Sequence, residues 1–278
     1  MQERLNWIKL EPQAWLHVEP LRGGMEIHGR LAQRYKDATF FLDIVDEKHR
    51  KLASKLIAKP WWAPARWKAS KLVVADSGAE SLPAESGFQM VWANMALHMS
   101  ANPQALIARW HQALAVDGFL MFSCLGPDSL KELRPIYTQQ GWGEPAHTFT
   151  DMHDWGDMLV AQGFAEPVLD MERITLTYET PERLLQDLRG LGRNLSPGRF
   201  KALRGRAWHQ QLKQALMYHL ADPYDNGRLK LSFEVIYGHA LRPARKLAIQ
   251  PQLNMSLEDM RMALKTGRLP VISKTRPE

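Results

Sequence analysis

The sequence predicts an α/β fold: a doubly wound, mostly parallel sheet with an antiparallel edge strand and a helical cap. Short apolar runs alternate with helical patterns through residues 15–124, the order that gives parallel strands joined by right-handed crossovers. The run at 118–124 is almost continuously apolar, as in a strand that is covered on both faces. Residues 229–241 instead alternate with period two, which predicts the strand that returns at the edge.

The first two predicted strands each lead into a helix. Residues 15–18 form a short apolar run before a turn with two glycines, and apolar residues at helical spacing then predict a helix over 27–35. Aromatic and β-branched residues predict a strand over 38–44. Acidic residues open the next helix, which continues to residue 57 and stops before Pro60.

The core continues after an irregular segment. Residues 59–71 contain two prolines and three tryptophans, a composition that excludes a regular element. Strands are predicted at 72–75 and 88–93, a helix at 103–115 and a strand at 118–124. Their spacing is that of successive strand–helix–strand units.

The second half of the chain is predicted to complete the sheet and to carry the cap. Helices are predicted at 128–140 and 151–162, and a strand at 167–178. We therefore divide the chain into a core of residues 1–180, a basic helical cap of residues 181–228 inserted in the sheet, the returning edge strand of residues 229–241, and a tail of residues 242–278 that we expect to be partly disordered.

The positive charge of the chain is concentrated in one segment. The formal net charge is 36 − 30 = +6. Residues 181–220 alone hold eight basic and two acidic side chains, an excess of 8 − 2 = +6. A local basic surface favours an acidic partner and speeds the encounter with it. The alternative interpretation is an ordinary solvated helix face.

Composition excludes several other classes of protein. With 278 residues, 45% of them hydrophobic, the chain is long enough for one large domain or a domain with a cap. Cys124 is the only cysteine, which excludes a disulfide framework and a cysteine-based metal site and favours a reducing, cytoplasmic location. The histidines show no metal-ligand spacing, so we expect no metal. No apolar run reaches the roughly 20 residues that cross a bilayer, so we expect no membrane association.

Two aspartates follow predicted strands where ligands bind in a doubly wound sheet, beyond the carboxyl ends of the strands. Asp43 ends the second strand, where a carboxylate accepts hydrogen bonds from a ribose diol. Asp76 follows the third strand, at the same edge of the sheet. Each has a structural alternative: Asp43 could cap the next helix, and Asp76 could belong to an Asp-Ser-Gly turn.

Residues 75–94, ADSGAESLPAESGFQMVWAN, resemble the class I S-adenosylmethionine (SAM)-dependent methyltransferases, which have a Rossmann-like sheet. The resemblance implies SAM as cofactor. It implies these cofactor-binding residues: Glu19, Gly23, Gly24, Asp43, Asp76 and Asn94. For Asn94, the alternative is a buried strand-end asparagine that bonds a neighbouring loop.

The glycine-rich turn departs from the family pattern. In the family, an acid precedes G-x-G-x-G, whereas this chain reads Glu19-Pro20-Leu21-Arg22-Gly23-Gly24. Those glycines let the backbone approach the methionine part of SAM, and proline removes an N–H donor. The sequence therefore predicts weakened or absent SAM binding as an alternative to an intact site, with Leu21, Arg22 or an indole ring filling the pocket.

Three later motifs resemble the malonyl-acyl-carrier-protein O-methyltransferases of biotin synthesis: residues 122–134, residues 152–159 with Gly163-Phe164, and residues 184–194. The resemblance implies methyl transfer from SAM to the free carboxylate of a malonyl thioester on acyl carrier protein. A carboxylate is already ionised, so no catalytic base is expected and the work is positioning. Arg189 is predicted to bind the substrate carboxylate, or else to form a helix-surface salt bridge with Asp187 or Glu182.

The cap also predicts a surface for acyl carrier protein or another acidic protein. The predicted partner-binding residues are Arg193, Arg199, Lys201, Arg204 and Arg206. Nucleic-acid binding is not expected, because no helix-turn-helix, single-strand platform or zinc module is present.

Two other functions remain open from the sequence. One is a non-catalytic relative that keeps the fold as a binding or assembly module after losing SAM binding. The other is an enzyme that modifies a protein side chain, because related proteins that assist respiratory complex I assembly share much the same cap. The loop with Trp61, Trp62 and Trp67 is predicted to form a lid, a contact patch or a packed insertion.

Overall fold

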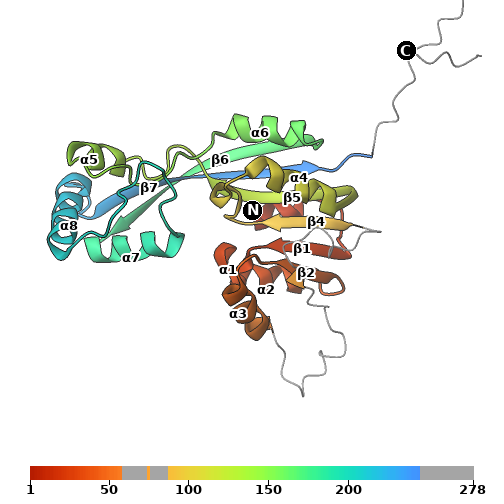
Figure 1. The fold of residues 1–278 in the computed structure, drawn as a ribbon. Helices are drawn as coiled ribbons and strands as arrows, with labels where there is room; N and C mark the ends of the chain where they lie inside the picture. The colour runs from red at the N-terminus through yellow and green to blue at the C-terminus, as the bar shows by residue number, and fades with distance from the viewer. Residues whose placement is uncertain (58–73, 76–86, 245–278) are drawn as a thin grey trace, which may run out of the picture. The chain divides into compact units, whose positions relative to one another are not determined.

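The sheet of the computed structural model, which describes residues 1–57, 74–75 and 87–244, has seven strands in the order β3-β2-β1-β4-β5-β7-β6 (Figure 1). The strands are β1 Ala14–Val18, β2 Thr39–Asp43, β3 Val74–Ala75, β4 Phe88–Ala93, β5 Leu114–Leu125, β6 Ala165–Tyr178 and β7 Leu229–Leu241. β1 pairs in parallel with β2 and β4, and β5 pairs in parallel with β4. The predicted α/β fold with a mostly parallel sheet is confirmed.

The antiparallel strand is β7, but it does not lie at the edge. It pairs antiparallel with β5 on one side and with β6 on the other, so the edge strand at this end of the described sheet is β6. The period-two pattern of residues 229–241 misled the prediction. Alternation reports that the two faces of a strand differ in burial, and it carries no information on how many neighbours the strand has.

The helices cover both faces of the sheet (Figure 1). The described α-helices are α1 Pro20–Gly23, α2 Met25–Arg34, α3 Glu47–Ile57, α4 Pro103–Ala113, α5 Leu133–Gln139, α6 Met152–Ala161, α7 Pro181–Leu191 and α8 Arg206–Leu220, with 3₁₀ turns η1 Gln2–Asn6 and η4 Leu97–Met99. Local chemistry sets several starts. The Asn102 side chain accepts from the N–H of Ala105 at 3.1 Å, and a proline follows it at the first helical position.

Two predicted helices are shorter than expected. Residues 128–132 do not join α5, because β7 holds them: Glu234 accepts from the N–H of Asp128 at 2.7 Å, and the Leu130 N–H donates to the Ser232 carbonyl at 2.8 Å. α4 stops at Ala113 rather than at residue 115, because Leu114 already pairs with Phe88 as the first residue of β5.

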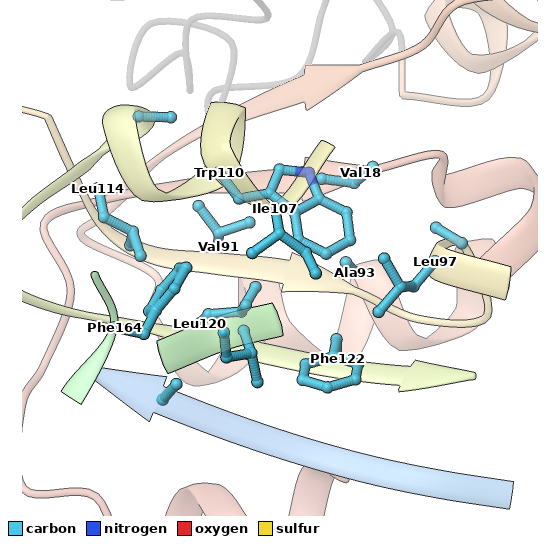
Figure 2. Packing of buried hydrophobic residues seen from close by; sticks show 14 of the residues in the cluster. Val18, Val91, Ala93, Leu97, Ile107, Trp110, Leu114, Leu120, Phe122 and Phe164 are labelled. Atoms are coloured by element: carbon cyan, nitrogen blue, oxygen red, sulfur yellow. The ribbon is translucent and has the colours of Figure 1, made fainter. Parts of the chain in front are cut away.

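The sheet is held by an apolar core on each face. Figure 2 shows the cluster in which Ile107 and Trp110 of α4 pack against Val91 of β4 and Leu120 of β5. Full burial of each such side chain contributes about 1.5–3 kcal/mol. On the other face, Trp15 and Leu31 belong to a cluster with α2. These two layers fix the strand ends at which the predicted site lies.

The cap has a core of its own, built on the far part of β7. Leu184 of α7 and Leu212 of α8 pack with Leu231 of β7, and Leu125 at the carboxyl end of β5 belongs to the same cluster. The helices of residues 181–220 therefore lie beside the carboxyl end of the parallel strands. The proposed tail of residues 242–278 lies almost wholly outside the described residues, as does the Trp61, Trp62 and Trp67 loop.

A buried histidine pair lies beneath β1. The Nδ1 atoms of His17 on β1 and His28 on α2 are 3.1 Å apart, so one ring donates and the other accepts. Both rings are buried. Burial lowers the pKa of His17 well below its usual range and that of His28 to about 4. The fold therefore holds both rings neutral.

This pair predicts a loss of stability in mild acid. The unfolded chain takes up protons near pH 6.5, whereas folded His28 takes one up near pH 4. The contribution of His28 to the free energy of unfolding is therefore fully present above pH 6.5 and is lost as the pH falls toward 4. It amounts to roughly 3 kcal/mol at about 1.36 kcal/mol per pKa unit. Denaturant unfolding between pH 7.5 and 4.5 measures it. His28→Gln is expected to flatten the pH dependence, and an unchanged slope would contradict this assignment.

Candidate functional site

A cavity of about 430 Å³ lies at the carboxyl ends of β1 and β2, and we call it the first cavity. Its walls are the start of α1, the residues after β2 and the segment from η4 into α4. Its charged lining residues are Glu19, Arg22, Asp43 and Arg109, and the other lining residues are small or apolar. Its volume is within the range of about 300–1,000 Å³ that is usual for small-molecule sites.

Glu19 joins β1 to α1 and presents a carboxylate to the first cavity. Its backbone is left-handed at φ 46°, and its N–H donates to the Asp43 carbonyl at 2.8 Å. Its Oε1 accepts from the N–H of Val45 at 3.0 Å. Its Oε2 is buried without a hydrogen-bond partner, and Arg22 Nε lies 3.6 Å from it. This oxygen therefore has an ion-pair partner in Arg22 but accepts no hydrogen bond.

The two predicted glycines have different structural roles. A Cβ on Gly23 would lie 2.6 Å from the carbonyl oxygen of Asn94, so only glycine lets α1 pack this closely against the end of β4. Gly24 has φ +100°, with open space where a Cβ would be. Leu21 packs into the core cluster around Trp15 and so does not fill the first cavity, whereas Arg22 lines it.

Asp43 is already paired across the first cavity. Its carboxylate Oδ2 accepts a hydrogen bond from Nη2 of Arg109, a residue of α4. Burial raises the pKa of Asp43, and the Arg109 guanidinium opposes that effect. The Arg109 side chain is 30% exposed and that of Asp43 only 7%. The alternative that Asp43 caps the next helix is not what the structure has, because Asp46 accepts from the N–H groups of Lys48 and His49 there.

The other two predicted cofactor residues lie elsewhere. The Asn94 side chain donates to the Gly23 carbonyl and accepts from the Ser123 hydroxyl at 2.5 Å, so it ties β4 to its neighbours and lines neither of the cavities described. This arrangement matches the structural alternative. Asp76 lies outside the described residues.

A second cavity, of about 120 Å³, lies between the carboxyl end of β5 and the cap. Most of its lining is apolar, and it includes Leu125, Phe149 and Leu188. Met99 lines both cavities, so the two are neighbours. Arg193 is the one lining residue with a permanent charge.

His98 is a neutral wall of the second cavity. Its Nδ1 accepts from the N–H of Leu125 at 3.4 Å, and its carbonyl accepts from His147 at 3.0 Å. Burial lowers the pKa of His98 to about 4. At neutral pH this ring is therefore a polar but uncharged neighbour of any ligand.

Arg189, the predicted substrate-binding residue, is exposed and lines neither described cavity. Its alternative salt bridges are taken by other residues, because Asp187 pairs with Arg183 at 3.3 Å and Glu182 with Lys213 at 3.0 Å. Its role stays a prediction.

The predicted partner-binding residues differ in how free their charges are. Arg193, Lys201 and Arg206 are exposed. Arg199 is also exposed, but its guanidinium donates to the Ser196 carbonyl at 2.9 Å. The Arg204 guanidinium lies 4.2 Å from the centre of the Phe200 ring and 4.1 Å from that of Trp208, and it donates to the Trp142 carbonyl. Arg204 therefore packs the cap itself.

Within the part of the chain that the structure describes, no group of three or more His, Cys, Asp or Glu side chains could hold a metal ion. The same residues contain no helix long and apolar enough to cross a membrane. Cys124 is buried, and burial raises the pKa of its thiol to about 12, so it is no nucleophile in this state.

Sequence reasoning did not identify Arg109, Met99 or His98 as site residues. Arg109 stands between the buried residues Ile107 and Trp110 on α4, so an arginine near the apolar face was the available signal. Met99 and His98 follow β4 in a short 3₁₀ turn, and nothing in their residue types distinguishes them from packing residues.

Curated relatives of known description match most of the chain. The malonyl-[acyl-carrier protein] O-methyltransferase of Laribacter hongkongensis is 40% identical over 225 residues, which are 78% of this chain and 72% of that protein. The protein of the same description from Gallionella capsiferriformans is 39% identical over 254 residues, 89% of this chain and 83% of the relative. No family model matches the chain.

Among solved structures, the chain is similar to a candidate methyltransferase from Bacillus halodurans. The two share 15% sequence identity and a TM-score of 0.57, and the match covers 87% of this chain and 98% of the other. At this identity the likeness concerns the fold.

Proposed function

The chain belongs to the malonyl-[acyl-carrier protein] O-methyltransferase family, and from this premise we propose that it transfers a methyl group from SAM to the free carboxylate of a malonyl thioester on acyl carrier protein. The observation that carries the proposal is the pair of neighbouring cavities that share Met99. The first is lined by two carboxylates and their two arginine partners, and the second by a single free guanidinium. Such a pair can hold a cationic methyl donor beside an anionic acceptor. The activity is of the type that serves biotin synthesis.

The residues of the first cavity fit SAM. Glu19 Oε2, which is ion-paired with Arg22 at 3.6 Å but accepts no hydrogen bond, can accept from the ammonium of the methionyl group. Asp43, at the carboxyl end of β2, can accept from the ribose hydroxyls. Leu21 does not fill the space, and no Cβ stands at Gly24. The first cavity is therefore open, although the turn lacks the other glycines of the family pattern.

The protein's contribution to the reaction is positioning. SAM supplies an electrophilic methyl group on a sulfonium. The acceptor oxygen forms a bond to the methyl carbon while the carbon–sulfur bond breaks, and that electron pair stays on sulfur. Because the acceptor is an ionised carboxylate, no side chain has to remove a proton. Neutral His98 and the apolar residues of the second cavity exclude water and hold the carboxylate in line.

The exposed basic residues of the cap support acyl carrier protein as the partner. Arg193, Lys201 and Arg206 are exposed near the second cavity or on the cap surface, where they can meet an acidic carrier protein. Arg199 and Arg204 contribute their charge while already donating to backbone carbonyls within the protein.

Two measurements on the full chain test this function. Mass spectrometry of malonyl-acyl carrier protein incubated with SAM and the protein is expected to show a gain of one methyl group on the malonyl carboxylate. Titration calorimetry with S-adenosylhomocysteine is expected to show binding. Absence of both results at high ligand concentration would favour a non-catalytic binding or assembly protein. Binding of the cofactor product together with methylation only of a protein side chain would favour an enzyme that modifies proteins.

The Asp43–Arg109 ion pair is expected to weaken cofactor binding relative to a protein in which Asp43 has no partner. Ribose hydroxyls have to share or displace Arg109 at the Asp43 carboxylate, and a partly exposed ion pair is worth up to about 1 kcal/mol. Arg109→Gln is therefore expected to tighten S-adenosylhomocysteine binding about fivefold. Calorimetry measures it, with Arg109→Lys as the charge-retaining control. Weaker binding by Arg109→Gln would mean that Arg109 contacts the ligand instead.

A further inference from the structure

The second cavity is lined mostly by apolar residues, its polar lining residues are His98, Tyr137, His147 and Asn194, and Arg193 is its one permanently charged residue. Arg193 follows the end of α7 and lines the cavity, and it makes no hydrogen bond or ion pair with any residue that the structure describes. Arg189, one helical turn earlier, lines neither cavity. Uncharged His98 forms part of the wall. A guanidinium without a partner on the wall of a mostly apolar cavity is a recognition element for an anion, because it can donate a charge-assisted hydrogen bond to a carboxylate.

We propose that the second cavity receives the carboxymethyl end of the acyl group and that Arg193, rather than Arg189, is the specificity-determining residue that binds its free carboxylate. This inference rests on the proposed methyl transfer. A cavity of about 120 Å³ holds several water-sized groups, so the carboxymethyl end has room there. Because Met99 lines both cavities, a carboxylate in the second lies next to the first. Arg193 binds one oxygen by a single N–H donor, and the other oxygen is the nucleophile.

The charge changes of the reaction determine what Arg193 can contribute. The carboxylate starts with a full negative charge, loses it as the new oxygen–carbon bond forms, and ends as a neutral ester. The bond to Arg193 is therefore strongest before the reaction and weakens toward the transition state. It contributes to binding of the malonyl group and not to the rate of the chemical step. It also favours release of the methyl ester, which has no charge for Arg193 to hold.

The matched variants Arg193→Gln and Arg189→Gln test the inference. A hydrogen bond to a charged group is worth about 1.5–3 kcal/mol, so Arg193→Gln is expected to raise KM for malonyl-acyl carrier protein about 10- to 100-fold. Its kcat is not expected to fall, because the lost interaction is stronger in the bound ground state than in the transition state. Arg189→Gln leaves KM nearly unchanged. Arg193→Lys restores part of the loss, because it keeps the charge.

A binding measurement separates this role from a structural one. With S-adenosylhomocysteine present, the wild type is expected to bind malonyl-acyl carrier protein more tightly than acetyl-acyl carrier protein, and Arg193→Gln is expected to lose that preference while its affinity for S-adenosylhomocysteine is unchanged. A wild-type KM in Arg193→Gln, or a larger effect from Arg189→Gln, would overturn the inference and leave the proposed function standing. A wild type that methylates no malonyl thioester would refute the proposed function, while the malonyl preference still reports on Arg193.

Discussion

Asp43→Asn is expected to weaken S-adenosylhomocysteine binding about 10- to 100-fold. The carboxylate at the end of β2 can accept two hydrogen bonds from a ribose diol, each worth about 1.5–3 kcal/mol when the acceptor is charged. Loss of one such bond, roughly 1.5–3 kcal/mol, corresponds to a factor of about 10–100 in the dissociation constant. Asparagine keeps the size of the side chain, so the change removes the charge and one acceptor without opening a cavity. Calorimetry of the purified variant gives the affinity.

The folded state is expected to tolerate Asp43→Asn. Burial disfavours the Asp43 charge in the free protein, and the variant removes that unfavourable term. Arg109 loses its partner, but its side chain is 30% exposed and water can solvate it. The unfolding midpoint should therefore move little. Affinity within threefold of the wild type would show that Asp43 is not the ribose partner.

Asp46→Asn is the matched control for this experiment. Asp46 lies three residues after Asp43, outside the first cavity, and its side chain accepts two N–H groups at the start of α3. Asp46→Asn, like Asp43→Asn, replaces a carboxylate by an amide and removes one negative charge. It is expected to cost part of a helix cap, at most about 1 kcal/mol, and to leave the affinity unchanged.

The strands could be predicted from the sequence because each is a local pattern. The starts and ends of β1, β2 and β4 are within about two residues of their predicted bounds, which is the usual precision of such boundaries. The errors lie where distant residues decide. Glu234 of β7 holds residues 128–130 out of a helix, and the neighbours of β7 are set by pairing across the sheet. No periodicity within either segment contains that information.

The candidate site divides in the same way. Asp43 and Glu19 were predictable, because the carboxyl ends of adjacent parallel strands meet at one edge of the sheet. Arg109 was not, because it comes from α4 and reaches Asp43 only in the folded chain. The eroded glycine pattern suggested a filled pocket, but whether Leu21 turns into the cavity or into the core depends on the helical turn α1, which the sequence did not predict.

Gly29→Ala is the control for a substitution at Gly23, the glycine that packs against the end of β4. Gly29 lies within α2, and a Cβ there meets nothing within 4 Å. Alanine is expected to stabilise this helix by roughly 0.5–1 kcal/mol and to leave ligand affinity unchanged. Gly29→Ala and Gly23→Val are therefore expected to change the folding stability in opposite directions.

Gly23→Val is expected to lower both stability and affinity. A Cβ at this position would lie 2.6 Å from the Asn94 carbonyl oxygen, and the end of β4 cannot retreat, because the Met95 N–H donates to the Ser123 carbonyl of β5 at 3.0 Å. α1 has to move instead, at a cost of about 1–3 kcal/mol for overpacking. The unfolding midpoint should fall by roughly 2–4 °C for each kcal/mol. Because Glu19 directly precedes α1, the same movement shifts the carboxylate that we propose binds the methionyl ammonium, and S-adenosylhomocysteine affinity should fall more than about tenfold. A variant that melts lower but binds normally would show that the turn serves only packing, and that the ligand sits away from α1.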